Sequence, residues 1–169
     1  MFILNSMAKI SIRDTSGNIL ESIDLGTIKK GETSPSFTFR VYNDYEQEGG
    51  HGTAYNVRVG VVIFKYSGVH RAFSKPLESH IIKNGIVEID CTISSKLNGG
   101  YPNVDWTPIA IINGVSDYFT GEDFDTIVPD PPNNFNEYKI RLANFPSESY
   151  FKGGNYSLFI KVLWDNRGE

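Results

Sequence analysis

Two clusters of carboxylates are the residues of this chain whose type and spacing come closest to a metal site. One lies just before a Gly-Gly pair and the other just after Gly121. Calcium takes several oxygen ligands from a flexible loop, but neither cluster has the spacing of a known calcium loop. We interpret both as solvated acidic loops, predict no metal site, and leave calcium binding open. The members are Asp44, Glu46 and Glu48 in the first cluster and Glu122, Asp123 and Asp125 in the second.

The histidines and the cysteine do not form a catalytic pattern. His51, His70 and His80 fall in expected loops or near strand ends, without the spacing of His-x-His or His-Glu-x-x-His. Cys91 is in register with apolar strand residues, which favours a buried, inert thiol over a nucleophile. We therefore expect no catalytic residue, no cofactor and no enzymatic activity. A carboxylate pair for glycoside hydrolysis is set by space rather than by spacing, so a hydrolase is kept as the least favoured alternative.

Glycine-rich and aromatic residues offer two further chemistries. Residues 49–52, Gly-Gly-His-Gly, lack the Lys and the Ser or Thr of a phosphate-binding loop. Tyr101, Trp106 and Trp164 could form a platform on which a sugar ring stacks. Trp164 lies on the apolar face of an expected strand, so we assign it to the core. The region of Tyr101 and Trp106 carries the alternative of a module that binds carbohydrate or a cell surface.

Length and composition are those of an ordinary globular chain. Its 169 residues are 40% hydrophobic and 21% charged, and a chain of this length buries roughly 70% of the surface that it exposes when unfolded. The net charge of −4 argues against a nucleic-acid partner, because phosphate contacts need a basic surface. A single cysteine excludes an internal disulfide.

The apolar stretches are too short for a signal peptide or a membrane span. Residues 1–4 are apolar, but no basic region precedes them. No apolar run approaches the ~20 residues that cross a bilayer. We expect a soluble protein that is made in a cytoplasm and has no membrane partner.

Alternation of apolar and polar residues with a period of two predicts an all-β protein. The clearest strands are 36–43 and 54–65. Residues 10–12 and 19–25 flank the turn sequence Asp-Thr-Ser-Gly-Asn, and we expect them to pair as a hairpin. So many short strands predict an antiparallel sandwich of two sheets. Further strands are expected over 71–74, 87–93, 106–112, 135–142 and 155–165.

The expected organisation is a short arm followed by one domain. Residues 1–8 form the arm, because large apolar side chains at a chain end need cover from a neighbouring subunit. Residues 9–169 form a single β-sandwich domain. Its excursion at 113–135 is rich in Asp and Pro, and long irregular segments are often functional. Phe159 and Leu163 fall on the outward face of the last strand and need cover from a loop, an arm or a partner.

Several short sequences resemble the opening of immunoglobulin-like domains in bacteriophage virion proteins and bacterial surface proteins. They are residues 24–28, Asp-Leu-Gly-Thr-Ile, and residues 31–34, Gly-Glu-Thr-Ser, before a strand that ends in Asn43. Residues 54–57, Ala-Tyr-Asn-Val, follow after a loop. The resemblance implies an immunoglobulin-like antiparallel β-sandwich, here with extra strands and long loops.

The same resemblance implies a structural role in the virion of a tailed phage. Such domains are similar to capsid decoration proteins, head fibres and tail accessory proteins. The expected protein is made in the cytoplasm of a host bacterium and joins the virion. There it binds the major capsid protein or other virion proteins, with a homotrimer as one expected state. The residues that we expect to contact these partners are Phe2, Ile3, Leu4, Tyr101, Trp106, Tyr118, Phe119 and Phe124.

Overall fold

The structure is a computed structural model whose described residues form strands and their connections. It describes residues 7–29, 31–66, 70–72, 87–92, 107–108, 111–112, 115–116, 126–143 and 154–166. Within these ranges no helix has the length and apolar character needed to cross a membrane, and the prediction of an all-β chain is confirmed. The strands are β1 (Ile10–Arg13), β2 (Ile23–Ile28), β3 (Phe37–Asn43), β4 (Ala54–Tyr66), β5 (His70–Ala72), β6 (Val87–Thr92), β7 (Thr107–Pro108), β8 (Ile111–Ile112), β9 (Val115–Ser116), β10 (Phe135–Leu142) and β11 (Gly154–Asn166).

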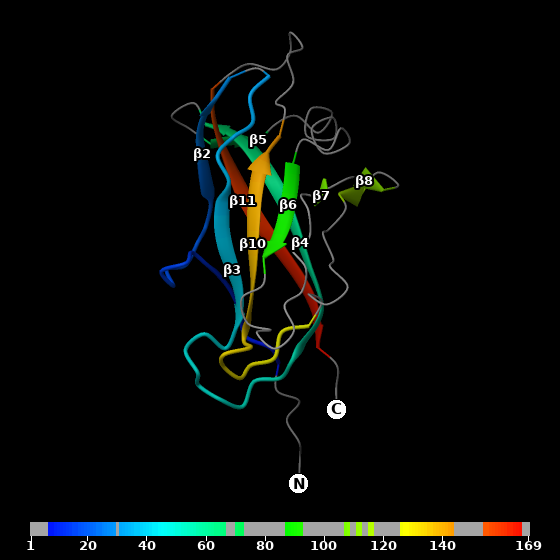
Figure 1. The fold of residues 1–169 in the computed structure, drawn as a ribbon. Helices are drawn as coiled ribbons and strands as arrows, with labels where there is room; N and C mark the ends of the chain where they lie inside the picture. The colour runs from blue at the N-terminus through cyan, green and yellow to red at the C-terminus, as the bar shows by residue number, and fades with distance from the viewer. Residues whose placement is uncertain are drawn as a thin grey trace.

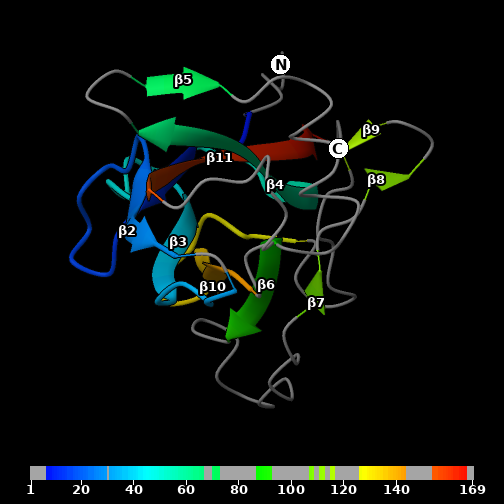
Figure 2. The ribbon, with the colours of Figure 1, turned by 90° about the horizontal axis from the view of Figure 1, so that it is seen from above.

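These strands pair antiparallel in three sheets. The five-stranded sheet has the order β1-β3-β10-β6-β7, and the four-stranded sheet has the order β2-β11-β4-β5. Strands β8 and β9 pair with each other. Figure 1 shows the long strands β4 and β11 crossing behind β3 and β10. Seen from above, the two larger sheets lie as two layers, one over the other (Figure 2).

The core lies between these two layers, because each sheet turns alternate residues inward. Phe39 and Tyr138 are register partners on β3 and β10, and their rings stack with centroids 5.3 Å apart. Full burial of a large apolar side chain contributes about 1.5–3 kcal/mol. The predicted apolar faces of 36–43 and 135–142 are confirmed where the structure describes them. The buried residues of the two layers include Ile23, Leu25, Ile28, Phe39, Val41, Val57, Val59, Tyr138, Ile140 and Leu142.

The predicted hairpin of residues 10–12 and 19–25 is wrong. The turn itself forms, since Asp14 N–H donates to Asn18 O at 2.9 Å. After a bridge between Arg13 and Ile19, however, the chain leaves β1 and enters the other sheet as β2. Strand β1 pairs with β3 and strand β2 pairs with β11. The physical reason is burial. As an edge strand of the four-stranded sheet, β2 buries Ile23, Leu25 and Ile28 in the core between the two layers.

A bulge in β2 explains the glycine of the Asp-Leu-Gly sequence. The register between β11 and β2 shifts between Asn155 and Ser157. At this place Gly26 has a φ of 71°, a conformation that costs other residues about 1–2 kcal/mol. Its N–H donates to Oδ1 of Asp24 at 2.8 Å. The glycine therefore permits the bulge, and the aspartate satisfies the amide that the bulge turns away from the ladder.

The expected single strand over 106–112 is also wrong, because its two ends belong to different sheets. β7 pairs with β6 in the five-stranded sheet, whereas β8 pairs with β9.

Part of the 113–135 excursion packs in the core. Ile127 is fully buried and exchanges two backbone hydrogen bonds with Ala54.

Candidate functional site

Asn43, the last residue of β3, joins three segments of the chain. Its side-chain amide donates to the carbonyl oxygens of Gly52 and Ile127, each at 2.9 Å. Its Oδ1 accepts from the backbone N–H of Lys9, also at 2.9 Å. The side chain is fully buried, so these bonds replace the water that its polar atoms lose. This asparagine fixes where the loop after β3 begins and where it ends.

The loop of residues 44–53 is built around the carboxylate of Asp44. This side chain is 3% exposed, and its oxygens accept the backbone N–H groups of Glu48 and Gly49 at 3.0 Å each. Burial alone would raise the pKa of Asp44, but these hydrogen bonds hold it below its ordinary value. Asp44 and Gln47 have positive φ, which lets the chain turn tightly over the carboxylate. Asp44 is thus the anchor of the loop.

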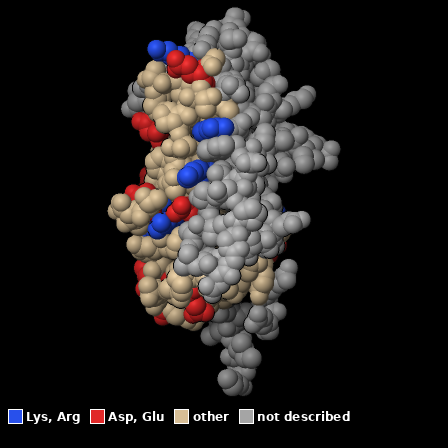
Figure 3. Space-filling model, in the orientation of Figure 1, with Lys and Arg blue, Asp and Glu red and all other residues tan. Residues whose placement is uncertain are grey.

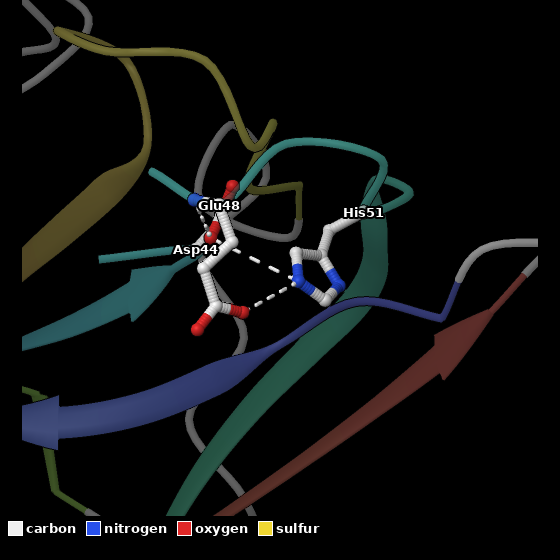
Figure 4. Close-up of side chains that lie close together, drawn as sticks. All are labelled: Asp44, Glu48 and His51. Atoms are coloured by element: carbon white, nitrogen blue, oxygen red, sulfur yellow. Dashed lines mark hydrogen bonds and ion pairs between the residues drawn. The ribbon is translucent and has the colours of Figure 1, made fainter. Parts of the chain in front are cut away.

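His51 points back from the end of this loop toward two of its carboxylates (Figure 4). Its Nε2 lies 3.4 Å from Oε2 of Glu48 and 3.9 Å from Oδ1 of Asp44. Its Nδ1 lies 3.1 Å from the carbonyl oxygen of Met7. One imidazole therefore connects the acidic loop to the N-terminal segment.

Lys9 brings positive charge to the same loop. Its Nζ is 2.8 Å from Oε2 of Glu48 and 3.2 Å from Oε2 of Glu46. The hydrogen bond to Glu48 raises the pKa of Lys9, and hydrogen bonds from Lys9 lower the pKa of Glu46 and of Glu48. Arg13 is a second cationic partner of Glu46. The acidic cluster is therefore paired with cations from β1 and the residues before it.

Backbone hydrogen bonds complete the attachment of the N-terminal segment. Asp44 N–H donates to the carbonyl of Lys9 at 2.9 Å, and Ala8 N–H donates to Oδ1 of Asn166 at 2.9 Å. Residues 7–9 are thus held by the loop on one side and by the end of β11 on the other. We call residues 43–52 together with Asn166 the N-terminal clamp.

The outer face of the four-stranded sheet carries the apolar residues noted in the sequence. Leu163 is 41% exposed, and Phe159 is half-buried. Nearby, Asn56 has a φ of 49° where the β4–β11 register shifts. Its side chain donates to Oδ2 of Asp165 at 2.9 Å, and Arg58 lies 3.5 Å from the other oxygen of that carboxylate. An exposed leucine therefore sits beside a polar cluster at a bulge.

Charge on the described surface is mixed. Figure 3, in the orientation of Figure 1, shows acidic and basic side chains interspersed over the described part of the face in view, without a large patch of either sign. Arg40 and Glu137, register partners on β3 and β10, form one such pair at 2.8 Å. A hollow of about 310 Å³ lies between the β2 bulge and the start of β3. Its lining is Asp24, Leu25, Gly26, Pro35, Ser36 and Phe37.

The residues predicted to contact partners all fall outside the described ranges. The second acidic cluster and His80 fall outside them as well, and the side chains of His70 and Cys91 are not described. Trp164, assigned to the core, is half-buried. The partner residues concerned are Phe2, Ile3, Leu4, Tyr101, Trp106, Tyr118, Phe119 and Phe124.

The clamp itself was not predicted, although its parts were visible. The sequence predicts a solvated acidic loop at Asp44, Glu46 and Glu48 and places His51 in an expected loop without a metal-type spacing. In the structure, Asp44, Glu48 and His51 place their ligand-type atoms within 4.8 Å of one another. The usable signal was the Gly49-Gly50 pair, whose positive φ values reverse the chain and return His51 to the carboxylates.

Comparison of the chain with protein-family models, with curated proteins and with solved structures finds no significant match.

Proposed function

We propose that the protein is a non-enzymatic structural component of a phage virion, a capsid decoration or head or tail accessory protein that binds the particle surface and reinforces it. The observation that carries the proposal is the N-terminal clamp. It fixes residues 7–9 to the body through side-chain and backbone bonds from Asn43, Asp44, His51 and Asn166. The apolar residues that precede them are thereby joined to the body at a defined point, as an arm for a neighbouring subunit requires.

The order of the strands supports an immunoglobulin-like sandwich as the finer fold. Along the chain, β1, β3, β4, β5, β6, β10 and β11 follow the sequence A, B, C, C′, D, E, F of that fold. In the sheets they give A-B-E-D in one layer and F-C-C′ in the other. Strand β2 lies beside β11, where the fold places strand G. Strand β2 therefore takes the position of strand G and adds no new layer.

Exposed apolar side chains near one end of β11 support a protein partner. Met7 is 68% exposed and Leu163 is 41% exposed. Ala8, next to Met7, is bonded to Asn166, three residues beyond Leu163. Single exposed apolar residues are common on soluble proteins. Met7 and Leu163 are two such residues, linked through the Ala8–Asn166 hydrogen bond near the end of β11, and a neighbouring subunit that covers them is what we propose.

Mass spectrometry of particles purified from the source of this sequence tests the proposal. We expect the chain in purified particles in a fixed ratio to the major shell protein, and its absence would contradict a virion role. Binding of the purified chain to particles that lack it gives the second measurement. Leu163→Asp should weaken this binding. Ile19→Asp is the control: it changes an apolar residue of the same size that is 67% exposed in the β1–β2 connection, and it should leave the binding unchanged.

A further inference from the structure

We infer that His51 is a pH-sensitive lock on the N-terminal segment. In this lock the doubly protonated ring joins the carbonyl of Met7 to the acidic loop, and loss of one proton breaks the link. Nδ1 of the ring lies 3.1 Å from Met7 O. Nε2 lies 3.4 Å from Oε2 of Glu48 and 3.9 Å from Oδ1 of Asp44. The side chain is 25% exposed, so it exchanges protons with solvent.

The link needs two protons because both ring nitrogens face acceptors. Carbonyl and carboxylate oxygens accept hydrogen bonds and donate none. A protonated imidazole donates from both nitrogens and places its positive charge beside the two anions (Figure 4). A neutral imidazole carries one proton, so it bonds either Met7 or Glu48 and turns a lone pair toward the other. The attachment is therefore complete at acid pH and weakens as pH rises through the range in which imidazoles titrate, about pH 5–8.

The charged groups that face the ring keep their charge across this range. The hydrogen bond to Glu48 raises the pKa of Lys9, and hydrogen bonds from Lys9 and then from His51 lower the pKa of Glu48. Burial would raise the pKa of Asp44, but two backbone amides hold it below its ordinary value. His51 is thus the group that changes charge. On the neighbouring segments, Glu46 pairs with Lys9 and Arg13, Asp165 pairs with Arg58, and Asp130 is exposed.

The lock acts on one peptide group, because the carbonyl of Met7 and the N–H of Ala8 belong to the same amide. His51 bonds the carbonyl, and Oδ1 of Asn166 accepts the N–H at 2.9 Å. Release of the carbonyl should therefore loosen the Ala8 amide as well. The next amide, that of Lys9, donates to the neutral side chain of Asn43 at 2.9 Å. Its attachment does not depend on the protonation of His51.

The consequence for binding rests on the proposed function. Residues 7–9 set the point at which the apolar residues before them join the body, and the lock fixes this point at acid pH. A neighbouring subunit that takes up the arm should therefore find it more rigidly placed at about pH 5 than at about pH 8. The lock itself is a property of the isolated chain and does not depend on the identity of the partner.

NMR spectra of the untagged full-length chain between about pH 5 and pH 8 test the lock. The protection factor of the Ala8 amide compares its hydrogen exchange with that of an unstructured peptide at the same pH. It should fall about three- to tenfold across this range, which corresponds to the loss of one hydrogen bond. The ring protons of His51 should titrate with the same midpoint. The Lys9 amide is the internal control and should keep its protection.

Three variants assign the pH dependence to the ring and its partner. His51→Gln keeps a hydrogen-bonding side chain that does not titrate, and the pH dependence at Ala8 should disappear. Glu48→Gln removes the anion that the second ring proton bonds, so the dependence should shrink. Glu46→Gln is the matched control. It removes the same charge from the same loop and also a partner of Lys9, and it should leave the dependence in place.

Three results would overturn the inference: an Ala8 protection factor that does not change with pH, a pH dependence that survives in His51→Gln, or equal changes in Glu48→Gln and Glu46→Gln. The first is measured on the unsubstituted chain, so it decides the question even where a variant fails to fold. Because all three use the isolated chain, failure of the lock does not contradict the virion role. Absence of the chain from purified particles would contradict that role without affecting the lock.

Discussion

The side-chain amide of Asn43 donates to the backbone carbonyl of Ile127 at 2.9 Å, across 84 positions of sequence. Both residues are fully buried. Ile127 in turn exchanges two backbone hydrogen bonds with Ala54, the first residue of β4. One asparagine thereby fixes the end of β3, the start of β4 and the segment before β10 relative to one another. The N-terminal clamp is built on this fixed point.

We expect Asn43→Leu, which keeps the number and branching of the side-chain heavy atoms, to destabilise the fold strongly. It would leave the N–H of Lys9 and the carbonyl of Gly52 without this partner. The carbonyl of Ile127 would lose one of two hydrogen bonds, because it also accepts the N–H of Ala54 at 3.0 Å. A buried polar group left unpaired costs about 1–3 kcal/mol, so the expected loss is about 3–5 kcal/mol in the free energy of unfolding by urea. Asn133→Ala, at an exposed asparagine, should change it by less than about 0.5 kcal/mol. Similar values for the two variants would contradict the role of Asn43.

The strands were predictable because their pattern is local. Alternation in 36–43 and 135–142 matches the buried faces of β3 and β10. Pairing was not, because the turn at Asp14–Asn18 forms in either arrangement of the strands that flank it. Burial of Ile23 and Ile28 between the two layers decides that β2 joins the four-stranded sheet, and that sheet is assembled from distant residues. Sequence periodicity gives a face but not the neighbour.

The clamp was not predictable for a related reason. His51 and Met7 meet across 44 positions, and a hydrophilic loop that folds back on the chain has the same composition as one that is solvated. The sequence predicts Asp44 to be a solvated charge, yet its side chain is only 3% exposed. Local signals were limited to the Gly49-Gly50 pair, whose positive φ values reverse the chain, and to Asn43, which ends the predicted strand 36–43.

Two glycines with positive φ should respond differently to substitution by alanine. The Cβ added by Gly26→Ala meets no atom within 4 Å. This variant should lose only about 1–2 kcal/mol of stability, because an alanine is strained at positive φ. At Gly17, with φ of 90°, an added Cβ would overlap the hydroxyl of Tyr45. That ring is held by the Arg13 guanidinium at 3.8 Å and by the edge contact of Tyr42 at 4.8 Å.

Gly17→Ala should therefore cost about 1–3 kcal/mol more than Gly26→Ala, the usual penalty for overpacking. Thermal and urea unfolding of both variants measure the difference. Gly17→Ala combined with Tyr45→Leu should recover most of it, because the overlapping hydroxyl is gone. Equal losses in the two single variants would show that the Tyr45 ring moves aside at little cost.

The β1–β2 turn should make stability depend on acid pH through Asp14. Hydrogen bonds from the side chain of Asn18, and then from backbone amides, lower the pKa of Asp14 in the folded state. A lowered pKa means that the ionised form stabilises the fold. This contribution is complete above the ordinary pKa and is lost as pH falls through the folded value. The free energy of unfolding of wild type minus that of Asp14→Asn should thus be constant near neutral pH and shrink below about pH 4.

Asn18→Ala is the control for this pH dependence. It removes the side-chain donor that lies 3.0 Å from Oδ2 of Asp14 and keeps the carboxylate. The fall in stability with acid should become shallower in this variant. If the difference between wild type and Asp14→Asn does not change with pH, the carboxylate charge contributes nothing to the turn.

The cross-strand pair of Arg40 and Glu137 should be worth more than the pair of Arg58 and Asp165. Arg40 Nε donates to Glu137 at 2.8 Å, and the two side chains are 27% and 17% exposed. Arg58 lies 3.5 Å from Asp165, which is 54% exposed. Because water screens exposed pairs, we expect a coupling of about 1 kcal/mol for the first pair and below about 0.5 kcal/mol for the second.

Double-mutant cycles measure both couplings under the same conditions. The first cycle uses Arg40→Met with Glu137→Gln, and the second uses Arg58→Met with Asp165→Asn. The single variant Arg40→Met should lower the free energy of unfolding by more than the coupling between Arg40 and Glu137. The reason is that the guanidinium also lies 4.7 Å from the centre of the Phe135 ring. Since that contact is absent from both arms that carry Met, it cancels in the cycle. Couplings of equal size would mean that distance and burial at Arg40 add nothing to the pairing of β3 with β10.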